Sequence, residues 1–206
     1  MICKPIAAGL GFAKACVLAF GVIAAAAAAP PPAAAGEAPA EFIGVLGGQA
    51  LEVIRSDAPL AQKAAYFRQM LSRDFNVAGM SRFVLGPYWR ATNAAQQQEF
   101  RTLFEDYLLH FYGRRLMQYG GQSFRVTGSR TDGAGIVVTS QILRQDGPPI
   151  AIDWRLGISD GRYKIDDVAI EGVSMALARR SEFAAVIARD GGQVEGLLAL
   201  LRDQAD

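Results

Sequence analysis

The apolar residues in the first half of the chain recur every three or four positions, which is typical of amphipathic helices. The first two predicted helices share this spacing, and their apolar positions are Phe42, Val45, Leu46, Ala50, Val53 and Ile54, then Leu60, Ala64, Phe67, Met70 and Leu71. Asp57 and Pro59 predict the cap and the first turn of the second helix. A short third helix is expected at about 77–84.

A long helix is predicted to follow the break at Gly86-Pro87. Thr92 or Asn93 would cap this helix, which would run to about Tyr119. Its buried stripe is wide and aromatic, and consists of Phe100, Leu103, Phe104, Tyr107, Leu108, Phe111, Tyr112 and Leu116.

The middle of the chain changes to alternating apolar and polar positions, which predicts β-strands. Four strands are expected, at about 124–129, 136–143, 150–158 and 163–170. Short turns would join them at Asp132-Gly133, Gly147-Pro148-Pro149 and Asp160-Gly161. Strands joined by such short turns form an antiparallel meander.

Helical spacing returns after Glu171-Gly172. Two last helices are predicted, with apolar stripes at Val173, Leu177, Phe183, Val186 and Ile187, then at Val194, Leu197, Leu198 and Leu201. The chain therefore predicts an α+β fold, in which helices pack on one face of a four-stranded antiparallel meander sheet.

The N-terminus has the pattern of a secretory signal peptide. Lys4 and Lys14 precede the apolar run 16–29, which is too short to cross a bilayer comfortably. Residues 33–35 are alanines followed by Gly36, as at a cleavage site. We predict a cleaved signal peptide over 1–35 and a single domain over 36–206; cleavage after Ala29 and an uncleaved anchor are the alternatives.

Removal of the signal peptide would change the composition in two ways. Both cysteines, Cys3 and Cys16, leave with it, so the mature chain would have neither a disulfide nor a thiolate metal site. Lys plus Arg falls from 21 to 19 against 20 Asp plus Glu, a net charge of 19 − 20 = −1. This balance argues against nucleic acid as a partner, and no second apolar run is long enough to cross a membrane.

Few residues of the chain are candidates for catalysis or metal binding. His110 is the one histidine, and Asp106 lies four positions earlier, so the two could pair across one helical turn. Asp166 and Asp167 form the tightest acidic pair, but neighbouring strand residues point to opposite faces and cannot chelate one ion together. We expect no catalytic residue, metal site or cofactor, and a small pocket enzyme using His110 and Asp106 is the alternative.

Several motifs occur together in an order and spacing that resembles a known family. They are FVLGPYWR at 83–90 with ATNAAQQQEF at 91–100, Tyr107-Leu108 and Tyr112 before YGGQ at 119–122, and DVAIEGVSM at 167–175 before RSEF at 180–183. Over nearly all of the mature chain, the sequence resembles the MlaC-type periplasmic lipid-binding proteins, also called the toluene-tolerance family. It departs from the family pattern at the basic Ala178-Arg179-Arg180 and at Tyr163, where a tryptophan is common.

The resemblance implies a soluble carrier that moves phospholipid through the periplasm, with the lipid as cargo. Its partners would be an outer-membrane lipoprotein complex and an inner-membrane ABC transporter complex with an MCE-domain subunit. A branch of the family is associated with hopanoid lipids, so the resemblance does not fix the identity of the bound lipid. We also expect a monomer. An acyl chain costs about 0.8 kcal/mol per CH2 to hold in water, so such a carrier hides it in an apolar cavity.

We place the lipid cavity between the inner sheet face and the helices, from strand parity and from position in the helical stripes. The predicted lipid-binding residues are Leu108, Phe111, Tyr112, Val138, Ile142, Ile152, Trp154, Ile165, Val168, Val173 and Phe183. Arg90 and Arg155 are predicted at the mouth or at docking surfaces. The same apolar residues could fill an ordinary core, so an adaptor with a solid core is a further alternative.

Overall fold

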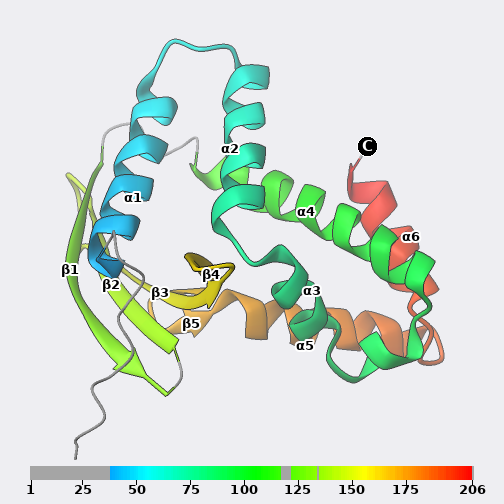
Figure 1. The fold of residues 1–206 in the computed structure, drawn as a ribbon. Coiled ribbons are helices and arrows are strands. Elements are labelled where there is room, and N and C mark those ends of the chain that lie inside the picture. Colours follow the sequence, from blue (N-terminus) through cyan, green and yellow to red (C-terminus); the bar gives the residue numbers. More distant parts are fainter. Residues whose placement is uncertain (1–37, 117–121, 134, 206) are drawn as a thin grey trace, which may run out of the picture. The chain divides into compact units, whose positions relative to one another are not determined.

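Helices form the first part of the chain, a sheet forms the middle and two more helices form the end (Figure 1). The computed structural model describes residues 38–116, 122–133 and 135–205. These residues belong to one unit, 34–206. The predicted signal peptide, 1–35, lies outside the described residues and stays a prediction.

The helical segments follow the predicted pattern. They are α1 (Pro39–Arg55), α2 (Leu60–Asp74), α3 (Val77–Leu85), η1 (Gly86–Ala91), α4 (Ala94–Leu116), α5 (Met175–Arg189) and α6 (Glu195–Ala205). The expected end of the long helix at Tyr119 falls outside the described residues. Among the helices of the described residues, none is long and apolar enough to cross a membrane.

The two predicted helix caps have different outcomes. Asn93 caps α4, because its Oδ1 accepts a hydrogen bond from the Gln96 amide at 2.9 Å and its own amide donates to Gln96 Oε1 at 3.1 Å. The predicted Asp57 cap of α2 is wrong. Pro59 occupies the N-cap position instead, and its carbonyl accepts hydrogen bonds from the amides of Gln62 and Lys63.

The sheet is an antiparallel meander in which each strand pairs with the next along the chain. Its strands are β1 (Ser123–Asp132), β2 (Gly135–Leu143), β3 (Ile150–Ser159), β4 (Arg162–Ile170) and β5 (Val173–Ser174). Asp160 and Gly161 both have positive φ, 52° and 72°, as the predicted two-residue hairpin turn requires. A β-bulge interrupts β1 between Val126 and Gly128.

Within the described residues the sheet has five strands, so the prediction of four was wrong. Val173 and Ser174 were expected to start the helix, but they turn back and pair with Ile170 and Ala169 to form β5. Asp167 holds this segment, since its carboxylate accepts hydrogen bonds from Ser174 Oγ at 2.5 Å and from the Ala176 amide at 3.0 Å. α5 therefore begins only at Met175.

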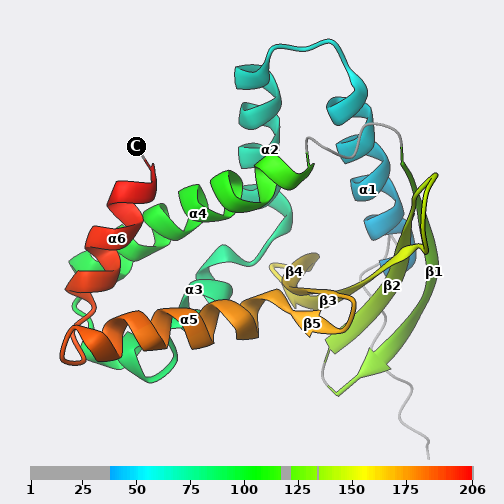
Figure 2. The same cartoon turned by 180° about the vertical axis from the view of Figure 1, so that it is seen from behind.

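The apolar core is divided into two clusters, which we call the helical cluster and the sheet cluster. The helical cluster draws its buried residues from the end of α2 and from α3 to α6, and it consists of Leu71, Met80, Val84, Leu85, Trp89, Phe100, Phe104, Leu108, Ala176, Phe183, Ile187, Val194, Leu197, Leu198 and Leu201. The sheet cluster lies between α1, α2 and the inner sheet face, and consists of Ile43, Leu46, Ile54, Phe67, Met70, Val138, Leu156, Tyr163 and Ile165. Figure 2 shows α1 beside β1 and β2, and α4, α5 and α6 grouped away from them.

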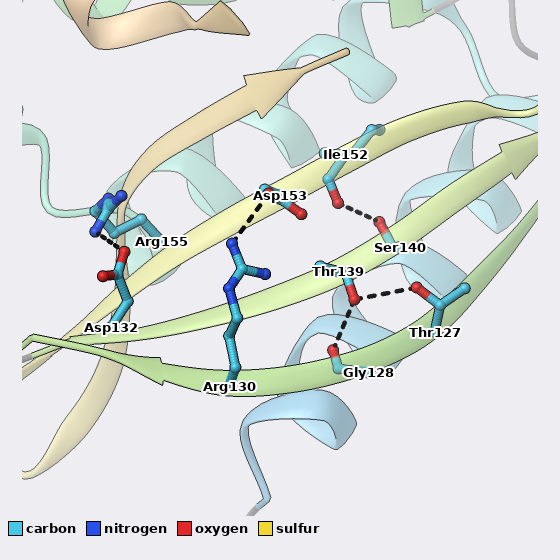
Figure 3. Close-up of polar contacts among 9 residues, drawn as sticks. All are labelled: Thr127, Gly128, Arg130, Asp132, Thr139, Ser140, Ile152, Asp153 and Arg155. Carbon is cyan, nitrogen blue, oxygen red and sulfur yellow. Dashed lines mark hydrogen bonds and ion pairs between the residues drawn. The ribbon is translucent and has the colours of Figure 1, made fainter. Parts of the chain in front are cut away.

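The outer sheet face, opposite α1, is polar. Arg130 pairs with Asp153 at 3.4 Å and Arg155 pairs with Asp132 at 2.8 Å across the strands, and both pairs are drawn in Figure 3. Val137 lies between the two arginines in the register, yet it is only 2% exposed. The two arginines flank Val137 in the register, and aliphatic stems of this kind can shield an apolar side chain from water.

Candidate functional site

The inner face of the sheet supplies one wall of the candidate site. Val138, Trp154 and Val168 are register partners across β2, β3 and β4, so their side chains lie in one row. Val138 and Ile165 are fully buried in the sheet cluster, and Trp154 and Val168 pack against it. The polar tip of Trp154 is satisfied within this wall, since its indole N–H donates to Ser140 Oγ at 2.8 Å.

Helix α4 belongs to the helical cluster and reaches the sheet cluster at Leu109. Leu108 is buried in the helical cluster and Tyr112 packs against it. Leu109 packs against both clusters, and so does Phe75, which lies between α2 and α3. The junction of the two clusters is therefore at these two residues.

Hydrogen bonds hold the segment between α2 and α3 against the sheet at this junction. The Asn76 amide donates to the Ile165 carbonyl at 2.9 Å. The Asn76 side chain donates to Asp166 Oδ1 at 2.8 Å and accepts from the Gly79 amide at 2.9 Å, which caps α3. One residue thus fixes the start of α3 relative to β4.

Some predicted residues lie away from the junction. Val173, in β5, is 55% exposed. Phe183 is enclosed by the rings of Phe100, Phe104 and Tyr107, with centroid separations of 5.7 to 6.1 Å, so it is an internal part of the helical cluster. Ile152 is buried and Ile142 half-buried.

The two predicted mouth residues are not brought together. Arg90 is exposed in η1, next to Trp89 of the helical cluster. Arg155 lies on the outer sheet face, paired with Asp132. Phe111 lines a hollow between α4, α5 and α6.

Comparison with known proteins gives the family. The profile of the family described as MlaC protein matches residues 47–203. This chain belongs to the MlaC family. The resemblance expected from the sequence motifs is confirmed.

Two MlaC-family relatives and one solved structure show how far the similarity extends. The intermembrane phospholipid transport system binding protein MlaC of Haemophilus influenzae is 25% identical over 175 residues, which cover 78% of this chain and 81% of that protein. The toluene tolerance protein ttg2D of Pseudomonas putida is 26% identical over 109 residues, 52% of this chain and about half, 51%, of that protein. The phospholipid-binding protein of Ralstonia solanacearum, solved in complex with a phospholipid, has a TM-score of 0.69 at 23% identity, over 79% of this chain and 94% of that one. This last likeness shows that the MlaC-family chain shares the same α+β fold.

Sequence reasoning missed Phe75, Leu109 and Arg179. Phe75 lies between two predicted helices, and Leu109 lies off the aromatic stripe of α4, so periodicity gave neither a role. The sequence pattern gave Arg179 no assigned role, but its side chain is only 12% exposed. The departure from the family pattern at 178–180 was the one sequence feature that could have drawn attention to Arg179.

The structure gives Asp106 a partner other than His110. Arg68 of α2 donates to Asp106 Oδ1 at 2.7 Å, and His110 is exposed on α4. Within the ranges that the structure describes, no three His, Cys, Asp or Glu residues lie close enough to hold a metal ion. Asp106 is therefore engaged by α2, whereas His110 lines the hollow between α4, α5 and α6.

Proposed function

We propose that this protein is a periplasmic carrier that holds the acyl chains of a phospholipid at the junction of its two apolar clusters and moves the lipid between the outer and inner membranes. The divided core is the observation that carries the proposal. Compact domains usually have one contiguous core with smaller satellites. Here the helical and sheet clusters meet at Phe75 and Leu109.

An acyl chain would complete this core. The row of Val138, Trp154 and Val168 would contact it from the sheet, and Leu108 and Tyr112 would contact it from α4. A chain of about sixteen CH2 groups gains on the order of 13 kcal/mol when it leaves water, at about 0.8 kcal/mol per group. Desorption of a two-chain lipid without a carrier is therefore very slow.

The relatives support this function. The Haemophilus protein is named as the binding protein of an intermembrane phospholipid transport system, and the Ralstonia protein of the same fold was solved with a phospholipid. We extend this function to the present chain as a proposal. The partners would be the outer-membrane lipoprotein complex and the MCE-domain ABC transporter complex, with Arg90 as a candidate docking residue on the helical side. Hopanoid stays an alternative cargo.

Native mass spectrometry of protein purified without detergent tests the proposal. We expect a lipid-sized mass adduct, whose fragmentation identifies a glycerophospholipid or a hopanoid. A bare protein would support the solid-core adaptor instead. A His110→Ala variant that folds and loads lipid as the parent protein does would dispose of the pocket-enzyme alternative.

A matched pair of variants locates the cavity. Trp154→Gln places a polar group in the inner wall, whereas Thr139→Gln places the same group on the outer face of the neighbouring strand. We expect the first to lose the adduct and the second to keep it, with both proteins folded by circular dichroism. Val168→Gln repeats the test if Trp154→Gln does not fold. Equal loading of all three would show that the lining is assigned wrongly.

A further inference from the structure

A hollow of about 690 Å³ opens between α4, α5 and α6, within the size range of small-ligand pockets. It lies on the side of α4 away from α2. Glu105 and Asp106 of α4 bind side chains of α2, whereas Tyr107 and Phe111 line the hollow. The hollow is therefore lined by other residues than the junction proposed to hold acyl chains, and it adjoins the junction at Phe111, whose ring centre lies 5.0 Å from that of Tyr112.

Arg179 presents a fixed positive charge to this hollow. Its guanidinium lies 4.9 Å from the ring centre of Phe111 and 5.9 Å from that of Tyr107. Its Nη1 donates to the Tyr107 hydroxyl and lies 2.6 Å from a carboxylate oxygen of Glu182, while its buried Nε has no hydrogen-bond partner among the residues that the structure describes. An arginine held by packing in this way is well prepared to bind an oxyanion, because little side-chain freedom is lost.

Two carboxylates share the hollow with Arg179, and His110 and Gln204 complete its polar lining. Glu182 is 54% exposed and so can move aside from Arg179, and Asp203 lines the hollow from α6. A purely anionic ligand would be repelled by both carboxylates, and a purely cationic one would be repelled by Arg179. A ligand that carries both signs would match both. Because Arg179 and Glu182 are in contact, the positive and negative groups of such a ligand must lie only a few bonds apart.

We propose that this hollow binds a phosphoethanolamine group, with the phosphate on Arg179 and the ammonium between Glu182 and Asp203. The aromatic rings of Tyr107 and Phe111 would form its floor. The requirement for a ligand with both a positive and a negative group follows from the charged side chains that line the hollow. The choice of phosphate over carboxylate, and of a lipid headgroup as the source, rests on the proposed function.

Amide NMR titration of the purified protein with O-phosphoethanolamine tests the site without any lipid. We expect shifts at Tyr107, Phe111, Arg179 and Glu182, and about fivefold weaker binding of inorganic phosphate or ethanolamine alone, since each lacks one charge partner. Shifts confined to other parts of the chain, or phosphate binding as tightly as O-phosphoethanolamine, would overturn the proposal.

Three variants separate the charge contributions. Glu182→Gln should weaken O-phosphoethanolamine about threefold to fivefold without weakening phosphate, as loss of one exposed charge pair predicts. Arg179→Gln should abolish binding of both probes. Arg180→Gln is the matched control, because the guanidinium of Arg180 lies 5.1 Å from the Phe83 ring, on another side of α5. If Arg179→Gln does not fold, the variant of the exposed Glu182 decides the matter. An unchanged affinity of Glu182→Gln for O-phosphoethanolamine would contradict the ammonium site.

The lipid source is tested separately from the carrier function. Native mass spectra should show ethanolamine lipids enriched over their share of the membrane extract. Adducts in the same proportions as the membrane would overturn the headgroup assignment and leave the carrier function standing. A protein without any lipid adduct would defeat the carrier function, and the titration with O-phosphoethanolamine would still decide whether the hollow is a zwitterion site.

Discussion

Asn76 performs two tasks at the junction of the clusters, so its replacement by alanine should cost more than loss of a helix cap. Loss of an N-cap costs about 1 kcal/mol. Loss of a hydrogen bond to a charged partner, here the 2.8 Å bond to Asp166, costs about 1–2 kcal/mol more. Together these give about 2–3 kcal/mol for Asn76→Ala, a fall in Tm of about 4–12 °C for a chain of this size.

Asn93→Ala is the matched control, because Asn93 caps α4 with the same geometry but makes no such link to the sheet. We expect it to cost about 1 kcal/mol in urea unfolding. A double-mutant cycle of Asn76→Ala with Asp166→Ala should return a coupling energy of about 1–2 kcal/mol. If the two asparagine variants lose stability equally, the bond to Asp166 contributes nothing and the reasoning about the pinned junction fails.

Two further predictions concern the helical cluster. Phe183→Ala should lower the free energy of unfolding by about 3–5 kcal/mol in urea titration, since it leaves a cavity among three rings, whereas Leu177→Ala on the same helix, 55% exposed, should cost less than about 0.5 kcal/mol. Burial raises the pKa of Tyr107 above its ordinary value of 10.0, with Arg179 opposing the shift. The unfolded chain then releases this proton first, so stability should fall as pH rises above about 10, and Tyr107→Phe should flatten that limb of the stability–pH curve. An unchanged slope in this variant would contradict the burial of the phenol.

The elements were predictable from the sequence because their signals are local. Apolar spacing located the helices and strands, and Asp160-Gly161 marked a turn that the backbone confirms. β5 was missed because two residues are too few to show alternation. Its position depends on Asp167, which holds Ser174 and the start of α5, a contact that no local pattern displays.

The candidate site was less predictable, because periodicity says which residues are buried but not which elements they meet. Val138 and Trp154 were assigned to the inner face correctly by parity, and the register places them side by side. Phe183 has the same apolar character, yet it packs among the rings of α4. The division of the core into two clusters depends on how α4 is set between α2 and α5, which is a tertiary property.

The bulge in β1 bears on whether a further chain can add to the sheet. β1 stands at the end of the strand order, and an unpaired strand edge is a template on which further chains can add. The extra residue between Val126 and Gly128 breaks the regular spacing of amide and carbonyl groups that a fibril needs. Arg125, which is exposed on this strand and donates to the neutral Gln141 side chain, would also repel its counterpart in a second copy laid against it. Loss of the bulge should therefore lower the solubility of the protein before it reduces lipid binding.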